Sequence, residues 1–290
     1  MKTLKETIKE AEANQTAIGH FNIANLEGLW AIFRAAQTLN LPVIIGLSEG
    51  ERDFVGARQA RVLVSSLREE FAYPIWLSAD HTYSLDRAQE AIDLGYDLIV
   101  FDRSELPLAE NISETKRCVE YARSVNPEIL VEGELGHIGK SSKLLDLVPE
   151  GVALTGAGLT TEAEAKQLVE ATGVDLFSPA VGNFHGMLKS GGHPQIDVEL
   201  IKKLRQAAGV PLVLHGGSGI TNDGFSAAIK AGISIVHINT ELRVVYRDAL
   251  RQALADEPDE IAPYKILKNA VTAMREVTER RLKLFAGQVN

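Results

Sequence analysis

The stretch IWLSADHTYSLDRAQEAIDLGYDLIVFD, residues Ile75–Asp102, contains one complete strand–helix–strand unit. A short apolar run leads to Asp80 and His81, a helical segment follows, and a second β-branched run ends at an aspartate. A helix is predicted over SLDRAQEAIDLG because apolar residues recur at helical spacing, Ser84 is a suitable N-cap and Gly95 stands where a C-cap is expected. Such a unit predicts two parallel strands joined by a right-handed helical crossover.

The same alternation recurs along the whole chain of 290 residues. The predicted strands are the apolar runs Ile18–Phe21, Val43–Leu47, Ile75–Leu77, Leu98–Phe101, Ile129–Val131, Leu176–Val181, Leu212–Leu214 and Ile233–Val236. Eight units in this length predict an α/β fold, a (β/α)8 TIM barrel that forms a single domain over residues 1–290. Residues from about 241 to 290 are predicted as a helical C-terminal extension that packs across the barrel or against a partner subunit. An open doubly wound sheet is the alternative, but the first strand is not followed by the glycine motif GxGxxG.

Composition and charge limit the classes of partner. The net charge is −9, which argues against a nucleic-acid or anionic membrane surface. No apolar run approaches the roughly 18 residues of a membrane span, and the opening MKTLKETIKEAEAN has no signal-peptide core. The single cysteine, Cys118, excludes an intramolecular disulfide. These features lead us to expect a cytoplasmic protein with a small-molecule ligand.

Polar residues stand at the end of nearly every predicted strand. In a barrel these ends form one mouth, where the active site lies. The residues expected to converge there are Asp80, His81, Asp102, Glu132, Glu134, His185, His215 and Asn239.

Three of the seven histidines favour a metal site at this mouth, namely His81, His185 and His215. Neutral imidazole suits Zn²⁺, and three protein ligands leave a position open for substrate. Any one of them alone is more typical of a hydrogen-bonded core or loop side chain. Asp80, beside His81, would stay ionised near a cation and act as a base, or else serve as a helix cap or as a partner of a histidine. His20, His137 and His193 receive no functional assignment.

Two segments that follow the last two strands lie where barrels often bind phosphate, and the first of them is glycine-rich. They are HGGSGI at His215–Ile220 and HINTELR at His237–Arg243, with Ser218 and Thr240 as hydroxyl donors. Glycines let backbone N–H groups approach an anion. A third segment, HGMLKSGG at His185–Gly192, contains Lys189 between its glycines. A plain tight turn is the alternative for the Gly-Gly-Ser segment.

The chain resembles class II, metal-dependent fructose-bisphosphate or tagatose-bisphosphate aldolases. The resemblance rests on seven segments in the same order: FNIANLE, PVIIGLSEG, LSADHT, VFDRSELP, VEGELG, AVGNFHGMLK and VLHGGSGI. The resemblance implies Zn²⁺ on His81, His185 and His215, Asp80 as the acid/base, and Asp102 and Glu134 at a second or displaced metal position. It also implies a substrate and phosphate site made of Gly186, Lys189, Gly217, Ser218, Asn239 and Thr240.

The resemblance further implies a carbon–carbon lyase that cleaves or forms a phosphorylated ketose through a metal-stabilised enediolate, without a Schiff-base lysine. A monovalent cation, Na⁺ or K⁺, near the phosphate loops and a homodimer or homotetramer belong to the same expectation.

Two departures from the family pattern bear on catalysis. The family has an acidic proton-transfer loop after ELG, whereas Ser141 and Ser142 stand there in this chain, and Asp146 or Glu150 would have to reach in from further along. His237 replaces the family's asparagine; it could contact a different substrate group, supply the proton or bind the metal. The roles of His237 and Ser142 stay open. A catalytically altered aldolase for another ketose phosphate, a non-catalytic sugar-phosphate-binding protein, or another barrel metalloenzyme such as an epimerase or hydrolase are the alternatives.

Overall fold

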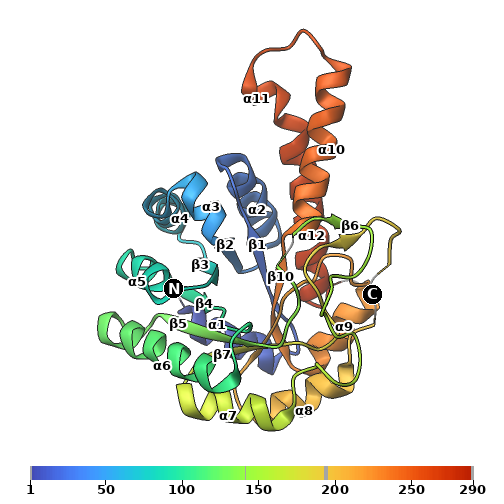
Figure 1. Cartoon of the computed structure of the whole chain (residues 1–290). Helices are drawn as coiled ribbons and strands as arrows, with labels where there is room; N and C mark the ends of the chain where they lie inside the picture. The colour runs from blue at the N-terminus through green and yellow to red at the C-terminus, as the bar shows by residue number, and fades with distance from the viewer. Residues whose placement is uncertain (1, 141, 193–194, 289–290) are drawn as a thin grey trace.

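The computed structural model describes residues 2–140, 142–192 and 195–288. Eight parallel strands close into a barrel in the order β1-β10-β9-β7-β5-β4-β3-β2, with helices around it (Figure 1). The barrel strands are β1 Ile18–Asn22, β2 Val43–Leu47, β3 Ile75–Thr82, β4 Leu98–Phe101, β5 Leu130–Leu135, β7 Leu176–Pro179, β9 Leu212–Leu214 and β10 Ile233–Ile238. The predicted (β/α)8 barrel is therefore confirmed.

Five strands differ from their predicted bounds at the carboxyl end. β1 ends one residue later, at Asn22, and β10 ends two residues later, at Ile238. β5 continues through Glu132 and Glu134 because both still pair with neighbouring strands. β3 continues to Thr82, which pairs with Phe101, and Asp80 and His81 lie in the register shift between Ala79 and Thr82. β7 stops at Pro179, two residues before the predicted end. A separate ribbon joins β6 (Leu144–Leu145) to β8 (Met187–Leu188) above the barrel.

The helices alternate with the strands. They are α1 Leu4–Ala13, α2 Leu26–Leu39, α3 Glu49–Val55, α4 Ala57–Phe71, α5 Leu85–Asp93, α6 Leu108–Val125, α7 Glu162–Thr172, α8 Val198–Ala208, α9 Asn222–Ala231, α10 Thr240–Asp256, α11 Pro263–Ile266 and α12 Lys268–Phe285. The Ser84 hydroxyl accepts from the Arg87 amide, as an N-cap should, and Gly95 takes a φ of +77° just beyond the end of α5.

Apolar side chains fill two regions. The larger core lies between the strands and the surrounding helices. The smaller lies inside the amino-terminal end of the barrel, where Leu4, Ile8 and Ala11 of α1 pack against one inward residue from each strand, among them Trp76 and Ile235. Because α1 closes this end, the inward-facing polar residues gather at the carboxyl end.

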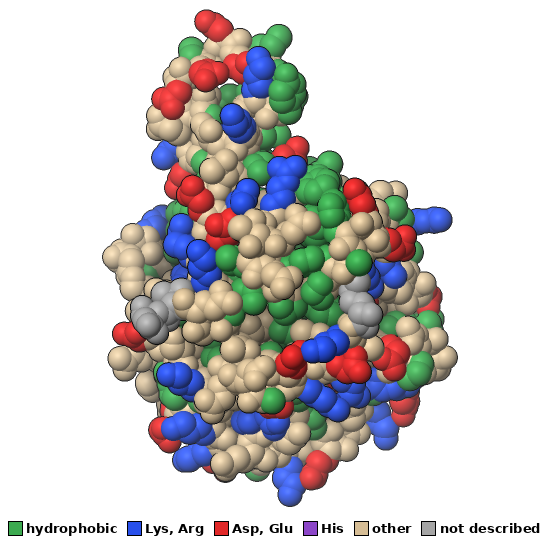
Figure 2. Space-filling model, turned by 180° about the vertical axis from the view of Figure 1, so that it is seen from behind, with side chains coloured by type: hydrophobic (Ala, Val, Ile, Leu, Met, Phe, Trp, Pro, Cys, Tyr) green, Lys and Arg blue, Asp and Glu red, His purple; other side chains and the backbone are tan. Residues whose placement is uncertain are grey.

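The C-terminal helices form a hairpin. α12 packs against α2, α10 and β1 beside the barrel, whereas α10 and α11 project as an arm (Figure 1). The arm exposes Leu254, Ile261 and Tyr264. Figure 2 shows the arm from behind, with acidic, basic and apolar side chains on its surface. Within the described ranges, no helix is both long and apolar enough to cross a membrane.

Candidate metal centre and active site

A cavity of about 500 Å³ opens at the carboxyl ends of the barrel strands. The predicted residues that line it are Asp80, His81, Ser142, His185, Gly186, His215, Gly217, Ser218, His237, Asn239 and Thr240. Side chains separated by more than 150 positions in the sequence therefore share one concave site.

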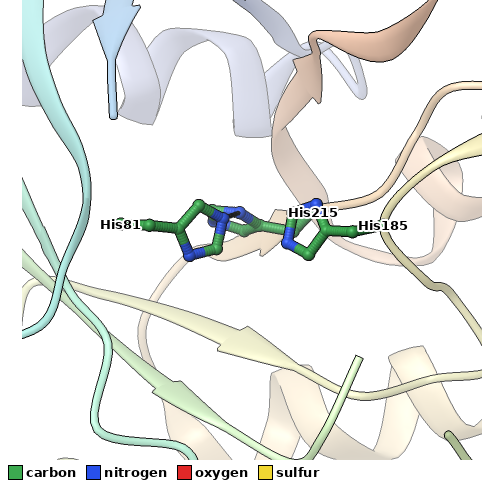
Figure 3. A group of neighbouring side chains, drawn as sticks. All are labelled: His81, His185 and His215. Carbon is green, nitrogen blue, oxygen red and sulfur yellow. Dashed lines mark hydrogen bonds between the residues drawn. The ribbon is translucent and has the colours of Figure 1, made fainter. Parts of the chain in front are cut away.

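The three predicted metal ligands meet at the floor of this cavity. His81 comes from β3, His215 follows β9, and His185 lies between β7 and β8. Figure 3 shows the His81 and His185 rings turned toward each other, with the His215 ring between them. One ligand nitrogen from each lies within 4.8 Å of the others, and His81 Nε2 is 3.0 Å from His215 Nδ1.

The end of β3 has an unusual backbone that brings two neighbouring residues into the cavity. The pairing with β4 shifts between Ala79 and Thr82, and His81 has a φ of +33°. Adjacent strand residues normally point to opposite faces, so the bend is what turns both Asp80 and His81 inward. Buried Arg52 supports the bend by donating to the Asp80 carbonyl and the Thr82 hydroxyl. Strain of this kind is typical of functional sites.

Carboxylates hold the ring nitrogens that face away from the centre. His81 Nδ1 lies 3.1 Å from Asp102 Oδ2 and 3.4 Å from Glu134 Oε2. His215 Nε2 lies 2.7 Å from Glu132 Oε1. Each carboxylate orients its imidazole so that the opposite nitrogen faces the centre, as is usual for metal-bound histidines.

The protonation of the rings suits a cation. Burial lowers the pKa of His215 to about 3 and holds that of His185 well below its usual range. Burial also disfavours a charged His81, but the Asp80 and Glu134 carboxylates raise its pKa well above its usual range. The pKa values of Glu132 and Glu134 are raised by burial and neighbouring carboxylates. The neutral imidazoles of His185 and His215 thus lie near several buried carboxyl groups. A bound cation would offset the negative charge of these groups when they are ionised.

The donor set fits a divalent metal. Three converging imidazoles backed by carboxylates are typical of a Zn²⁺ site that leaves a position open for substrate. A second set of His81, Asp102 and Glu134 also brings its ligand atoms within 4.8 Å of one another. Glu134 Oε2 is buried and lies 3.4 Å from His81 Nδ1 without forming a hydrogen bond within the described ranges, so it is placed to serve as a ligand.

Asp80 is held ionised beside the three histidines. Burial opposes its ionisation, but the charge of His81 and the contact with His237 keep its pKa well below the usual range. Asn22 Nδ2 donates to Asp80 Oδ2 over 2.8 Å, and His237 Nδ1 lies 3.2 Å from Oδ1. A buried, ionised carboxylate at the cavity wall can accept a proton at neutral pH.

The loops after β9 and β10 form the opposite wall of the cavity. Ser218 Oγ accepts from the Glu241 amide in the first turn of α10, so the HGGSGI loop and the α10 amino terminus lie together. A Cβ at Gly217 would lie 2.8 Å from the His237 carbonyl oxygen, which shows how closely the two loops approach. Backbone N–H groups at such a loop and helix start suit an anion.

Lys189 does not join this wall. Its Nζ pairs with Asp146 Oδ1 over 2.9 Å, just after the β6–β8 ribbon, and it does not line the cavity. The cations that line the cavity are Lys140, Lys143 and Arg243.

The acids considered as substitutes for the missing proton donor face outward. The Asp146 side chain is 82% exposed, and Glu150 is also exposed. Ser142 lines the cavity, whereas Ser141 and His193 lie outside the described residues.

Several residues of the site received no role from the sequence. His20 lies inside the barrel with its ring stacked on that of His237, and Glu51 joins Asn22 to Arg243 through 2.8 Å and 2.5 Å contacts. Asn22 directly follows the predicted strand Ile18–Phe21. Alternation along β1 was an available signal, because His20 and Asn22 lie two residues apart and face the same side.

Gly216 is predicted to be essential for the shape of the His215 loop. Its φ is +63°, and a Cβ there would lie 2.4 Å from the Phe184 carbonyl oxygen. We expect Gly216→Ala to lower the free energy of unfolding by about 3 kcal/mol or more. The cost of a left-handed backbone at alanine and the cost of the clash with the Phe184 carbonyl are both incurred. Gly209→Ala is the matched control, since its φ is +70° in open space, and should cost about 1–2 kcal/mol. Equal losses in denaturant titrations would contradict the clash.

Comparisons with known proteins agree with this geometry. The family described as "Fructose-bisphosphate aldolase class-II" matches residues 2–289. A fructose-bisphosphate aldolase of Geobacillus stearothermophilus is 35% identical over 288 residues, covering 98% of this chain and 96% of that protein. A fructose-bisphosphate aldolase of Staphylococcus aureus is 34% identical over 286 residues, with the same coverage.

Solved structures give the same result. The crystal structure of the YdjI aldolase from Escherichia coli K12 superposes with a TM-score of 0.80 and 28% identity, covering 98% of this chain and 97% of that chain. A putative fructose-1,6-biphosphate aldolase from Coccidioides immitis superposes with a TM-score of 0.83 and 28% identity, over 97% and 95% of the two chains. The match extends over almost the full length in sequence and in structure, and the chain belongs to the class-II fructose-bisphosphate aldolase family, a family of lyases.

Proposed function

We propose that this protein is a zinc-dependent aldolase that cleaves and forms a phosphorylated ketose, of the fructose or tagatose 1,6-bisphosphate type. The observation that carries the proposal is the convergence of His81, His185 and His215 beside ionised Asp80 in one cavity. The membership of the chain in an aldolase family supports it.

The three imidazoles would hold Zn²⁺, with Glu134 and Asp102 at an alternative or second position. When bound, such a cation supplies Lewis-acid polarisation of the substrate carbonyl. Asp102, Glu134 and Glu132 fix the ring orientations through the contacts described above, so the nitrogens that face the cavity are available as ligands.

Asp80 would take the proton of the hydroxyl next to the bond that breaks, and return it in the reverse reaction. Its fixed position lets it act without reorganising, and positioned acid–base groups contribute about 10²–10⁴ in rate. The opposite wall, with Gly186, Gly217, Ser218, Asn239 and Thr240, would bind a substrate phosphate through N–H and hydroxyl donors. We propose Lys143 and Arg243, rather than Lys189, as the cations nearest to this phosphate, because they line the cavity.

A monovalent cation near these loops and a cytoplasmic location remain part of the proposal. We also propose a homodimer or a homotetramer. Exposed Leu254, Ile261 and Tyr264 on the projecting arm support an assembly of copies.

One observation favours a second candidate, a sugar-phosphate-binding protein without turnover. Among the described residues of the loop between Gly139 and Gly151, the acids are Asp146 and Glu150, and neither lines the cavity. The family's proton transfer at the enediolate carbon then has no carboxylate from this loop.

Cleavage assays separate the two candidates. We expect the zinc-loaded protein to cleave fructose 1,6-bisphosphate or tagatose 1,6-bisphosphate, measured by coupled oxidation of NADH, and to lose activity on dialysis against a chelator. Borohydride with substrate should not inactivate it, because no Schiff base forms. Tight phosphosugar binding in thermal-shift measurements without any cleavage would favour the binding protein, and full activity in metal-stripped protein would refute the metal mechanism.

A further inference from the structure

Two histidines lie face to face inside the barrel, and one of them, His237, lines the cavity. His20 on β1 and His237 on β10 are register partners, and their rings stack with centroids 3.5 Å apart and planes 7° apart. Both side chains are buried. A Cβ at Gly46 of β2 would lie only 2.1 Å from His20 Cε1, so the ring occupies space that this glycine leaves open. The arrangement is therefore set by three adjacent strands.

The His237 ring borders the acid/base carboxylate. Its Nδ1 lies 3.2 Å from Asp80 Oδ1, while Asn22 Nδ2 donates to Asp80 Oδ2 over 2.8 Å. On its other side the His237 ring contacts the His215 ring, with centroids 3.9 Å apart. His237 thus lies between Asp80 and the metal-ligand set. Asp80 Oδ2 accepts from Asn22, whereas Asp80 Oδ1 is buried without a well-aligned hydrogen bond within the described ranges, and His237 Nδ1 lies 3.2 Å from it.

Packing alone does not account for these imidazoles. Both ring nitrogens of His20 and Nε2 of His237 are buried and lack a hydrogen-bond partner within residues 2–140, 142–192 and 195–288. A buried polar atom without a partner destabilises a fold, and an apolar side chain of similar volume would fill the same space at lower cost. The imidazole at His237 has a use that an apolar group lacks, namely an N–H beside Asp80.

We propose that His237 is a positioning residue for the aldolase base: its Nδ1–H donates to Asp80 Oδ1, Asn22 holds Oδ2, and the stacked His20 ring fixes the plane of the donor. With a donor on each oxygen, the Asp80 carboxylate keeps one orientation, in which it faces the cavity. The assignment of Asp80 as base rests on the proposed function, whereas the proposed hydrogen bond and the proposed tautomer of His237 can be tested without it. With Nδ1 protonated, the neutral His237 ring carries its bare lone pair at Nε2.

The kinetic test uses zinc-loaded full-length protein. His237→Phe keeps a ring on His20 but removes the donor, and we expect kcat to fall about 10- to 100-fold, the range for a lost hydrogen bond to a charged group, while KM and zinc content change little. His237→Asn restores a donor on a shorter side chain and should recover part of the loss. His137→Phe, outside the cavity lining, is the matched control and should retain activity.

A double-mutant cycle separates positioning from a general structural effect. Because His237 acts through Asp80, His237→Phe should lower kcat little further when Asp80 is already alanine. Losses that multiply independently in the double variant would overturn the proposal, as would unchanged kcat in a folded His237→Phe protein.

A second measurement does not depend on turnover. In ¹⁵N NMR spectra of histidine-labelled protein, the His237 signals, assigned by their loss in His237→Phe, should show the Nδ1–H tautomer and change in Asp80→Ala. The Nε2–H tautomer would overturn the proposal whether or not the protein cleaves a ketose phosphate. Two zinc ions per chain, one of them lost in His20→Leu, would also overturn it, because the pair would then be metal ligands. A wild-type protein that shows the Nδ1–H tautomer but no cleavage would support the hydrogen bond and refute the proposed function.

Discussion

His185→Ala is expected to remove the catalytic zinc and abolish carbon–carbon cleavage. Only two of the three imidazoles that converge on the cavity would remain. The affinity for zinc should fall by more than the roughly 100-fold seen when a residue that hydrogen-bonds to a metal ligand is removed. The His185 ring makes no side-chain hydrogen bond with another described residue and packs on the His81 ring, so its removal leaves no buried group newly unpaired. Metal analysis after dialysis and the cleavage assay measure both losses.

His215→Ala is the informative comparison. It should also lose zinc, but it removes the partner of fully buried Glu132, so the free energy of unfolding should fall by about 3 kcal/mol or more. His137→Ala serves as the control with normal metal content, since His137 does not line the cavity. Full zinc occupancy in folded His185→Ala protein would contradict the assignment of the three ligands.

The convergence of the site could be predicted because a parallel barrel places all carboxyl strand ends together. Asp80, His81, His215 and Asn239 each follow an apolar run, so locating the strands was enough to locate these residues. The prediction needed no knowledge of which strands are neighbours. It also tolerated errors of several residues in strand length, since β3 ends at Thr82 rather than at the predicted Leu77.

Features that depend on register and long-range pairing could not be predicted in this way. His20 interrupts an apolar run and, taken alone, is typical of a core side chain; its importance follows from its pairing opposite His237, which only the closed barrel establishes. Lys189 follows a glycine loop that suggests a phosphate contact, but pairing of the two-residue strands β6 and β8 places it beside Asp146. Strands this short carry no periodic signal.

Asp80→Ala is expected to lower kcat by about 10²–10⁴ while the bound zinc is retained. The carboxylate is buried, ionised and adjacent to the metal-ligand set, but it is not one of the three imidazoles that would hold the ion. Loss of its charge removes one carboxylate from a region where Glu132 and Glu134 already have raised pKa values. Folding should therefore survive. Single-turnover cleavage and metal analysis on the same preparation test both parts.

Asp80→Asn distinguishes the loss of the base from the loss of packing. The amide has nearly the shape of the carboxylate and can still accept from Asn22, but it cannot take a proton at neutral pH. Equal losses of kcat in the alanine and asparagine variants identify proton transfer as the missing function, because only the alanine variant also opens space beside His237. Turnover retained in Asp80→Asn would show instead that Asp80 only shapes the cavity. The proton would then have to be taken by another group that lines the cavity, such as His237, whose Nδ1 lies 3.2 Å from Asp80 Oδ1.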